Sequence, residues 1–205
     1  MPVLPSEMVP SEIRPFAVTF DYRCPFARIA HEFVLEGLEG GADWQVRFVP
    51  FSLSAAKEPA WDRAQDSGLL ALELAVAVRD TQPDRFLAAH RALFEVRHGK
   101  GLSLRDAEVL RDALAEAGVD ADAAFAEVDS GVPLKTVRAE HERAAAEHEV
   151  WGVPTFLVDD QAVFVRLMDR PADSDVPARE AVERIVTMAG GWPALNEFKH
   201  TTLPR

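Results

Sequence analysis

The chain contains a single cysteine, Cys24, among 205 residues. One cysteine cannot form an internal disulfide and cannot supply a cysteine-rich zinc site. Basic residues are also scarce, because 22 Lys and Arg stand against 34 Asp and Glu, giving a formal net charge of −12. A negative field of this size repels polyanions, so we expect neither nucleic acid nor an anionic membrane as a partner.

The sequence also lacks a secretory signal and a long hydrophobic run. Its first seven residues show neither a basic n-region nor an apolar h-region. The longest apolar stretch, residues 68–78, is interrupted by Glu73 and is too short to cross a bilayer. We therefore expect a cytoplasmic protein, in which a free thiol stays reduced.

The first fifty residues predict a βαβ unit behind an N-terminal arm. Four prolines within residues 1–15 indicate a loose arm. Residues 16–20 are apolar and β-prone, and Pro25 opens a helical pattern that stops at Gly40-Gly41. A second strand is predicted over residues 44–51. The length of the crossover favours parallel strands.

Residues 57–149 differ in character, being rich in alanine and helix-periodic, with almost no strand signal. We expect an all-helical insertion here. Its predicted helices are 69–82, 86–94, a helix from a capping box at 103–106 to Gly118, 120–128 and 134–149.

A hairpin and a last helix are predicted to follow. Its strands are 154–158 and 162–165, with a turn at Asp159-Asp160, and the helix covers 177–189 before Gly190-Gly191. The order β-α-β, helical block, β-β-α predicts an α/β fold with a four-stranded mixed sheet. The expected units are a discontinuous domain of residues 16–56 and 150–191, the insertion 57–149, the arm 1–15 and a tail 192–205.

Cys24 lies between a predicted strand and the N-terminus of a predicted helix. Unpaired N–H groups and the helix dipole favour a thiolate there, and Arg23 adds a positive charge next to it. We therefore expect a reactive thiol that is ionised at neutral pH. The alternative is a buried structural cysteine, since free cysteines are among the most buried residues.

Two segments of the sequence resemble one known superfamily. Residues 20–27, Phe-Asp-Tyr-Arg-Cys-Pro-Phe-Ala, are similar to the active-site segment of DsbA-like thioredoxins, which has Cys-Pro-x-Cys at a strand-to-helix turn. Residues 152–156, Gly-Val-Pro-Thr-Phe, resemble the second signature, which contains a cis-proline. The resemblance covers about residues 16–190 and implies a thioredoxin-like fold with an all-helical insertion. Within the superfamily, the Phe-Asp-x-x-Cys-Pro phrase and residues 49–53 are most similar to the FrnE-like, mycothiol-dependent nitroreductase branch.

The chain departs from this pattern at Ala27, which stands where the second cysteine would be. The dithiol cycle needs that cysteine to attack the mixed disulfide. The resemblance therefore implies a monothiol oxidoreductase, in which mycothiol or glutathione resolves an adduct formed with an oxidised or electrophilic substrate. Two alternatives stay open. One is a thiol-dependent isomerase or transferase of the hydroxychromene-carboxylate isomerase or kappa-class glutathione transferase type, and the other is a non-enzymatic redox sensor or binding scaffold.

The resemblance also assigns roles to residues around the thiol. Cys24 would be the nucleophile, and Val153 would offer backbone groups to the bound thiol beside Pro154. Phe26 and Trp151 would line the substrate groove, with core packing as the alternative for both. Tyr22 would hydrogen-bond an adduct, and Arg23 and Pro25 complete the expected thiol-binding set.

Other residues carry weaker signals. His90 falls on an apolar helical face and is predicted to be a packing residue. His141 and His148 lie seven apart on a charge-rich helix, where a solvated face is favoured over a metal site. No motif indicates a metal, flavin or nicotinamide. A homodimer is compatible with the sequence.

Overall fold

The four β-strands form one mixed sheet. A computed structural model describes residues 13–58, 61–200 and 202 of the chain, so most of the expected arm, residues 1–12, lies outside the described residues. The strands are β1 (Phe16–Phe20), β2 (Val46–Pro50), β3 (Thr155–Val158) and β4 (Gln161–Phe164), in the order β2-β1-β3-β4. β1 is parallel to β2 and antiparallel to β3, and β3 and β4 form the hairpin. The predicted α/β fold with a four-stranded mixed sheet is confirmed.

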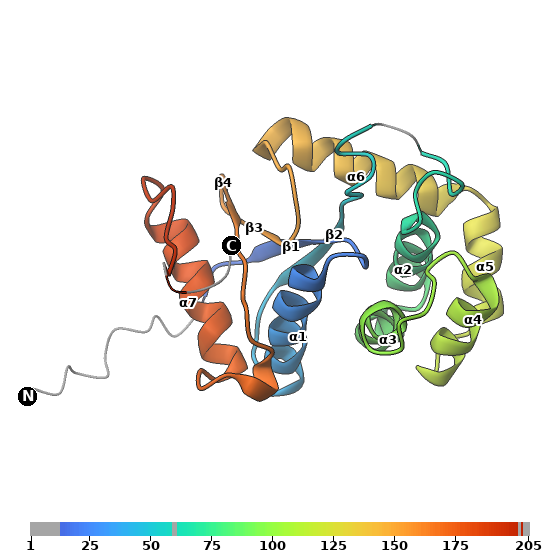
Figure 1. Cartoon of the computed structure of the whole chain (residues 1–205), viewed down its shortest axis with the longest axis horizontal. Helices are drawn as coiled ribbons and strands as arrows, with labels where there is room; N and C mark the ends of the chain where they lie inside the picture. Colours follow the sequence, from blue (N-terminus) through green and yellow to red (C-terminus); the bar gives the residue numbers. More distant parts are fainter. Residues whose placement is uncertain (1–12, 59–60, 201, 203–205) are drawn as a thin grey trace, which may run out of the picture.

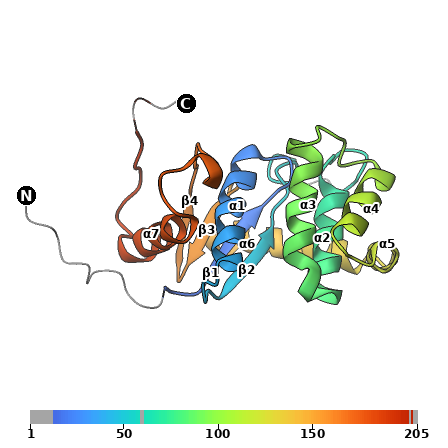
Figure 2. The same ribbon diagram turned by 90° about the horizontal axis from the view of Figure 1, so that it is seen from below.

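Helices cover both faces of the sheet. The helix α1 (Pro25–Glu39) and the helix α7 (Ala178–Gly191) pack together on one face, and α6 (Val132–His148) crosses the other face (Figures 1 and 2). The central strand β1 is buried along its whole length. Its alternating side chains therefore contribute to the packing under both helical layers.

The remaining helices lie between β2 and β3 in the sequence and beside the β2 edge of the sheet (Figure 1). They are α2 (Leu69–Thr81), α3 (Phe86–His98), α4 (Ala107–Glu116) and α5 (Ala121–Asp129), with the short 3₁₀ turn Pro83–Arg85 before α3 and another, Pro171–Asp173, before α7. α3 packs directly against α1, so the helical block contacts the helix that begins at Cys24.

Three predicted helix boundaries are wrong. The helix α3 continues to His98, four residues past its predicted end at residue 94. The helix α4 begins after Asp106, whose carboxylate accepts hydrogen bonds from the N–H groups of Glu108 and Val109, so Asp106 and not Ser103 is the N-cap. The helix α7 continues through Gly190 and Gly191 to a cap at Trp192, because neither glycine adopts the left-handed conformation that ends a helix.

None of the helices in the described part of the chain combines the length and apolar character needed to cross a membrane.

Candidate active site around Cys24

Cys24 is the N-cap of α1. Its backbone is extended, Pro25 occupies the first helical position, and Cys24 Sγ accepts a hydrogen bond from the N–H of Ala27 at 3.4 Å. Proline suits this position because its missing N–H would have no partner in the helix. The local sequence therefore places the sulfur at the positive end of the helix dipole.

The second signature segment, which leads into the neighbouring strand β3, contacts the thiol. The Val153-Pro154 peptide bond is cis, as the resemblance implied. The Cys24 thiol donates a hydrogen bond to the carbonyl oxygen of Val153 at 3.4 Å, although the two residues lie 129 positions apart in the sequence. The structure thus brings the two signature segments together at one site.

Three hydrogen bonds hold the segment that contains the cis bond. Thr155 N–H donates to Thr19 Oγ1 on β1 at 2.9 Å, and the Thr155 hydroxyl donates to the carbonyl of Gly152 at 2.8 Å. Val165 N–H donates to the carbonyl of Pro154 at 3.1 Å, which extends the β3–β4 pairing past the end of the hairpin. We call residues 151–155 the cis-Pro loop.

Burial of Cys24 opposes the ionisation that its position at the helix N-terminus predicts. Burial raises the pKa of Cys24, whose side chain is only 9% exposed, above the ordinary thiol value. The N–H groups of Ala27 and Phe26 lower this pKa and the carboxylate of Asp21 raises it, but desolvation has the largest effect. The helix N-terminus alone therefore does not decide the charge of the sulfur.

The positive charge of Arg23, which we expected to act on the thiol, is bound by other groups. Its guanidinium binds the carboxylates of Asp21 and Asp66, at 2.5 and 3.0 Å, and the hydroxyl of Ser54. Both carboxylates are almost fully buried. A Cβ on Gly68 would lie 2.8 Å from Arg23 Nε, so this close approach requires glycine. Arg23 neutralises buried carboxylates, and its charge is not available to activate the thiol.

Tyr22 is also turned into the protein. Its side chain is fully buried, and its hydroxyl lies 2.6 Å from Nδ1 of His90. In this conformation the hydroxyl cannot reach a bound adduct, so the expected contact is wrong. The prediction that His90 is a packing residue is confirmed, since it is buried among aromatic rings and hydrogen-bonded on both ring nitrogens.

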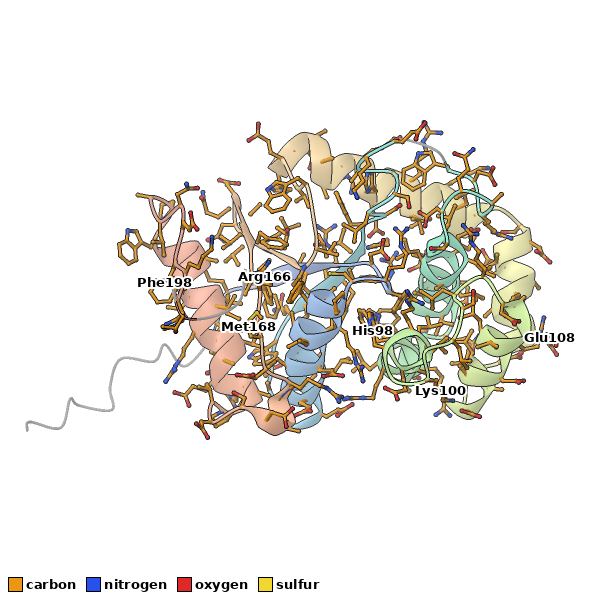
Figure 3. All side chains as sticks on the ribbon, viewed as in Figure 1. His98, Lys100, Glu108, Arg166, Met168 and Phe198 are labelled. Atoms are coloured by element: carbon orange, nitrogen blue, oxygen red, sulfur yellow. The ribbon has the colours of Figure 1, made fainter. Side chains whose placement is uncertain are left out.

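The outer side of the thiol carries aromatic residues and one cation. Pro25 is exposed and Phe26 half-buried, and the guanidinium of Arg166 lies 4.7 Å above the Phe26 ring. Figure 3 shows Arg166 beside the N-terminal end of α1. Trp151 is 70% exposed and packs against Phe164 with 4.7 Å between ring centroids. We call Phe26, Trp151, Phe164 and Arg166 the outer surface of the site.

A hollow of about 420 Å³ lies at the opposite end of β1, next to Phe16, Gln45 and Asp159, so it is not part of this outer surface.

Sequence reasoning missed His31, His98, Phe164 and Arg166. His31 is fully buried on α1, and His98 donates from Nε2 to the carbonyl of Tyr22 at 2.9 Å. Two histidines eight residues apart on α3, His90 and His98, with Phe94 midway between them, were the signal that could have revealed a functional stripe.

The expectation of a solvated helix face at His141 is wrong. His141 is 6% exposed and packs between Phe51 and Trp61, with ring centroids 4.2 and 5.2 Å away. The helix α6 turns this residue toward the helical block, which its charge-rich sequence did not indicate.

A profile of the DSBA-like thioredoxin domain family matches residues 17–170, about three quarters of the chain. The chain belongs to this family. The match includes Cys24, the whole helical block and the cis-Pro loop. The fold is accordingly that of thiol-disulfide oxidoreductases, and it supports thiol-based redox or isomerase chemistry.

The chain is also similar to individual proteins and solved structures. The chain is 28% identical over 190 residues to the uncharacterized protein Rv2286c of Mycobacterium tuberculosis, covering 90% of this chain and 81% of the relative. A probable DsbA oxidoreductase of Streptomyces coelicolor has a TM-score of 0.61 at 18% identity, with 92% of this chain and 94% of that one covered. Reduced DsbA1 of Neisseria meningitidis has a TM-score of 0.57 at 18% identity, with 91% and 89% covered. These two structures share the fold.

Proposed function

We propose that the protein is a monothiol thiol-disulfide oxidoreductase in which Cys24 is the nucleophile. A low-molecular-weight thiol, mycothiol or glutathione, would resolve the mixed disulfide. One observation carries the proposal: the only cysteine caps α1 against the cis-Pro loop, and buried Ala27 occupies the position of a second cysteine. The thiol is in the place that the family uses for chemistry, without the group that would complete an internal cycle.

The reaction requires two exchanges. The Cys24 thiolate attacks one sulfur of a mixed disulfide between the substrate and the small thiol, forms a disulfide with the small thiol and releases the substrate thiolate. A second small-thiol molecule, as its thiolate, then attacks the sulfur of the adduct. The Cys24 thiolate leaves, and the two small thiols depart as their disulfide. The sum is reduction of the mixed disulfide by one further small-thiol molecule, with the disulfide of two small thiols as the oxidised product.

The buried thiol must lose its proton before the first exchange. Its raised pKa leaves few molecules ionised at neutral pH, but a thiolate of high pKa is intrinsically a strong nucleophile. The N–H groups of Ala27 and Phe26 stabilise the thiolate once it forms. The hydrogen bond from the thiol to Val153 must break at this step, and that frees the Val153 carbonyl to pair with the backbone of a bound thiol.

The outer surface provides the contacts for a small thiol. Trp151 and Phe26 offer ring faces, and the guanidinium of Arg166 lies over the Phe26 ring. We propose a cytoplasmic location, where such thiols are abundant and reduced, and assign no metal, flavin or nicotinamide to the site.

A second candidate is a thiol-dependent isomerase or transferase. The raised pKa of Cys24 and its donated hydrogen bond favour this function, because the protein thiol stays protonated. The helix N-terminus would then stabilise the thiolate of the bound small thiol in place of the protein's own sulfur. Cys24→Ser would keep this activity, since a hydroxyl can still donate a hydrogen bond to a thiolate.

Intact mass spectrometry tests the proposal. The protein is incubated with oxidised mycothiol or oxidised glutathione, and we expect one adduct per chain that a second small thiol removes. Cys24→Ser is the control and should form no adduct. Ala27→Cys is the matched variant, in which the adduct should resolve into an internal disulfide without added thiol, because the Ala27 N–H already contacts Cys24 Sγ.

The three hypotheses give different results. Without an adduct, turnover by Cys24→Ser in a thiol-dependent isomerisation would establish the second candidate. Without an adduct and without turnover of small thiols or disulfides, the chain is a binding scaffold. Either result overturns the monothiol oxidoreductase.

A further inference from the structure

The helix α3 holds Tyr22 at three points. His90 Nδ1 lies 2.6 Å from the Tyr22 hydroxyl, the Phe94 ring packs edge-to-face on the Tyr22 ring at 4.7 Å, and His98 donates to the Tyr22 carbonyl at 2.9 Å. These three residues are spaced by four, so they form one stripe on α3. We call His90, Phe94 and His98 the Tyr22 clamp.

The hydrogen bonds that continue from the clamp have one possible direction. The carbonyl of Thr19 can only accept, so His31 Nε2, at 3.1 Å, carries the proton and His31 Nδ1 accepts. His90 Nε2, 2.8 Å from His31 Nδ1, must then donate, which leaves His90 Nδ1 to accept from the Tyr22 hydroxyl. With both imidazoles neutral, each of these buried polar atoms has a partner.

The same network reaches both groups that meet at the thiol. Tyr22 precedes Cys24 by two residues, so the clamp fixes the backbone that leads into the N-cap of α1. At the other end of the network, the Thr19 hydroxyl oxygen accepts from Thr155 N–H in the cis-Pro loop. The contact between Cys24 Sγ and the Val153 carbonyl lies between these two anchors.

We propose that the Tyr22 clamp holds Cys24 in the position that the proposed exchange uses and shields it from other reagents. The helical block, through α3, holds Tyr22 and thereby keeps the Cys24 thiol seated against the cis-Pro loop and limits its exposure. His90 and His98 are positioning residues and do not touch the reacting atoms. The consequence for turnover rests on the proposed function, whereas the positioning of the thiol does not depend on any activity.

His98 offers the cleanest test of the clamp. It is half-buried at the last turn of α3, and Figure 3 shows it extending from α3 toward α1. Its Nε2–H is the atom that donates to Tyr22, because a carbonyl cannot donate. The side-chain amide of glutamine can place a donor close to this position, whereas leucine has none and the amide of asparagine is too short to reach it.

The measurement is the rate at which iodoacetamide alkylates Cys24, followed by mass from pH 7 to pH 10. His98→Leu should accelerate alkylation about fivefold, the increase in open population that the loss of one hydrogen bond allows. His98→Gln should restore the rate of the unchanged protein. His148→Leu, on α6 at the far end of β1, is the matched control and should have no effect.

A urea titration under the same conditions shows which variants are folded. If His98→Leu is unfolded, His98→Asn takes its place and should show the same acceleration. An unchanged or slower rate in the folded donor-free variant would overturn the proposal. So would equal acceleration in His98→Gln, because the hydrogen bond would then not be the cause. The absence of any disulfide adduct would refute the proposed function but leave this result intact.

Discussion

The two sides of Cys24 are built differently. On the side of α3, Tyr22 and His90 are fully buried and every polar atom of their network has a partner. On the side of β4, Trp151 is 70% exposed and Arg166 lies at the surface above Phe26. Burial and saturated hydrogen bonding fit a role in holding the thiol, and exposed rings and charge fit a role in binding a ligand.

Residues adjacent in the sequence are divided between these sides. Tyr22 and Arg23 immediately precede Cys24, yet both point into the protein, whereas Phe26 contacts the outer surface. The turn between β1 and α1 produces this division, because the chain reverses direction at the N-cap. Proximity to a nucleophile in the sequence therefore says little about contact with its substrate.

The largest effect is expected from the arginine on the buried side. Arg23→Met should lower the free energy of unfolding by about 3–5 kcal/mol, because Asp21 and Asp66 would remain buried without their cation. Arg166→Met, on the outer surface, should cost about 1 kcal/mol or less, because Arg166 is exposed and interactions of charged groups at the surface contribute little. Urea denaturation of both variants measures the difference.

Comparing these two arginine variants tests directly whether the two sides of Cys24 differ in their contribution to stability. If the two variants lose similar stability, Arg23 is not a structural residue and the proposed division of the site fails. The m-values should also agree with that of the unchanged protein, because both substitutions are expected to act on the native state.

The next largest effect concerns pH and the buried histidines. Burial lowers the pKa of His31 from 6.5 to about 4, and burial, with the positive charge of Arg91 and the neighbouring His31, lowers the pKa of His90. In the unfolded chain both histidines take up a proton at a higher pH than they do in the folded protein. Their contribution to the free energy of unfolding is therefore fully present above about pH 7 and falls as the pH decreases from 6.5 toward 4. The loss should reach about 3 kcal/mol for His31.

Urea titrations at pH 7 and pH 5 measure this loss. His31→Gln has no titrating group at the position and should lose less stability between the two pH values than the unchanged chain. Equal losses in the two proteins would show that His31 is not kept neutral by the fold, and the fixed direction of the hydrogen-bond network would then be wrong.

Most of the fold could be predicted because its signals are local. The apolar strand 16–20, Pro25 after Cys24 and the break at Gly40-Gly41 each act through neighbouring residues. The prediction errors occurred where tertiary packing determined which side chains are buried. His141 lies on a charge-rich helix, yet it is buried because α6 packs that side of the helix against Phe51 and Trp61.

The site was predictable in its position but not in its electrostatics. The two signature segments identified Cys24 and the cis-Pro loop, and the structure joins them by a hydrogen bond. The charge on Cys24 was not predictable, because it depends on how much of the sulfur is buried by residues distant in the sequence. The roles of Tyr22 and Arg23 likewise depend on His90 and Asp66, which lie 68 and 43 positions away.

The smallest effect on stability, and the sharpest test of the outer surface, is expected for Trp151→Ala. The side chain is 70% exposed, so the free energy of unfolding should change by about 0.5 kcal/mol or less. The affinity for oxidised mycothiol or glutathione should fall about tenfold, as for an aromatic contact residue worth about 1.4 kcal/mol.

Trp192→Ala is the matched control, since Trp192 is 59% exposed at the end of α7. Calorimetric titration of the Cys24→Ser form compares binding without adduct formation. An equal affinity in the Trp151 and Trp192 variants would show that Trp151 is not part of the binding surface. The exposure of an aromatic side chain would then not indicate contact with the ligand.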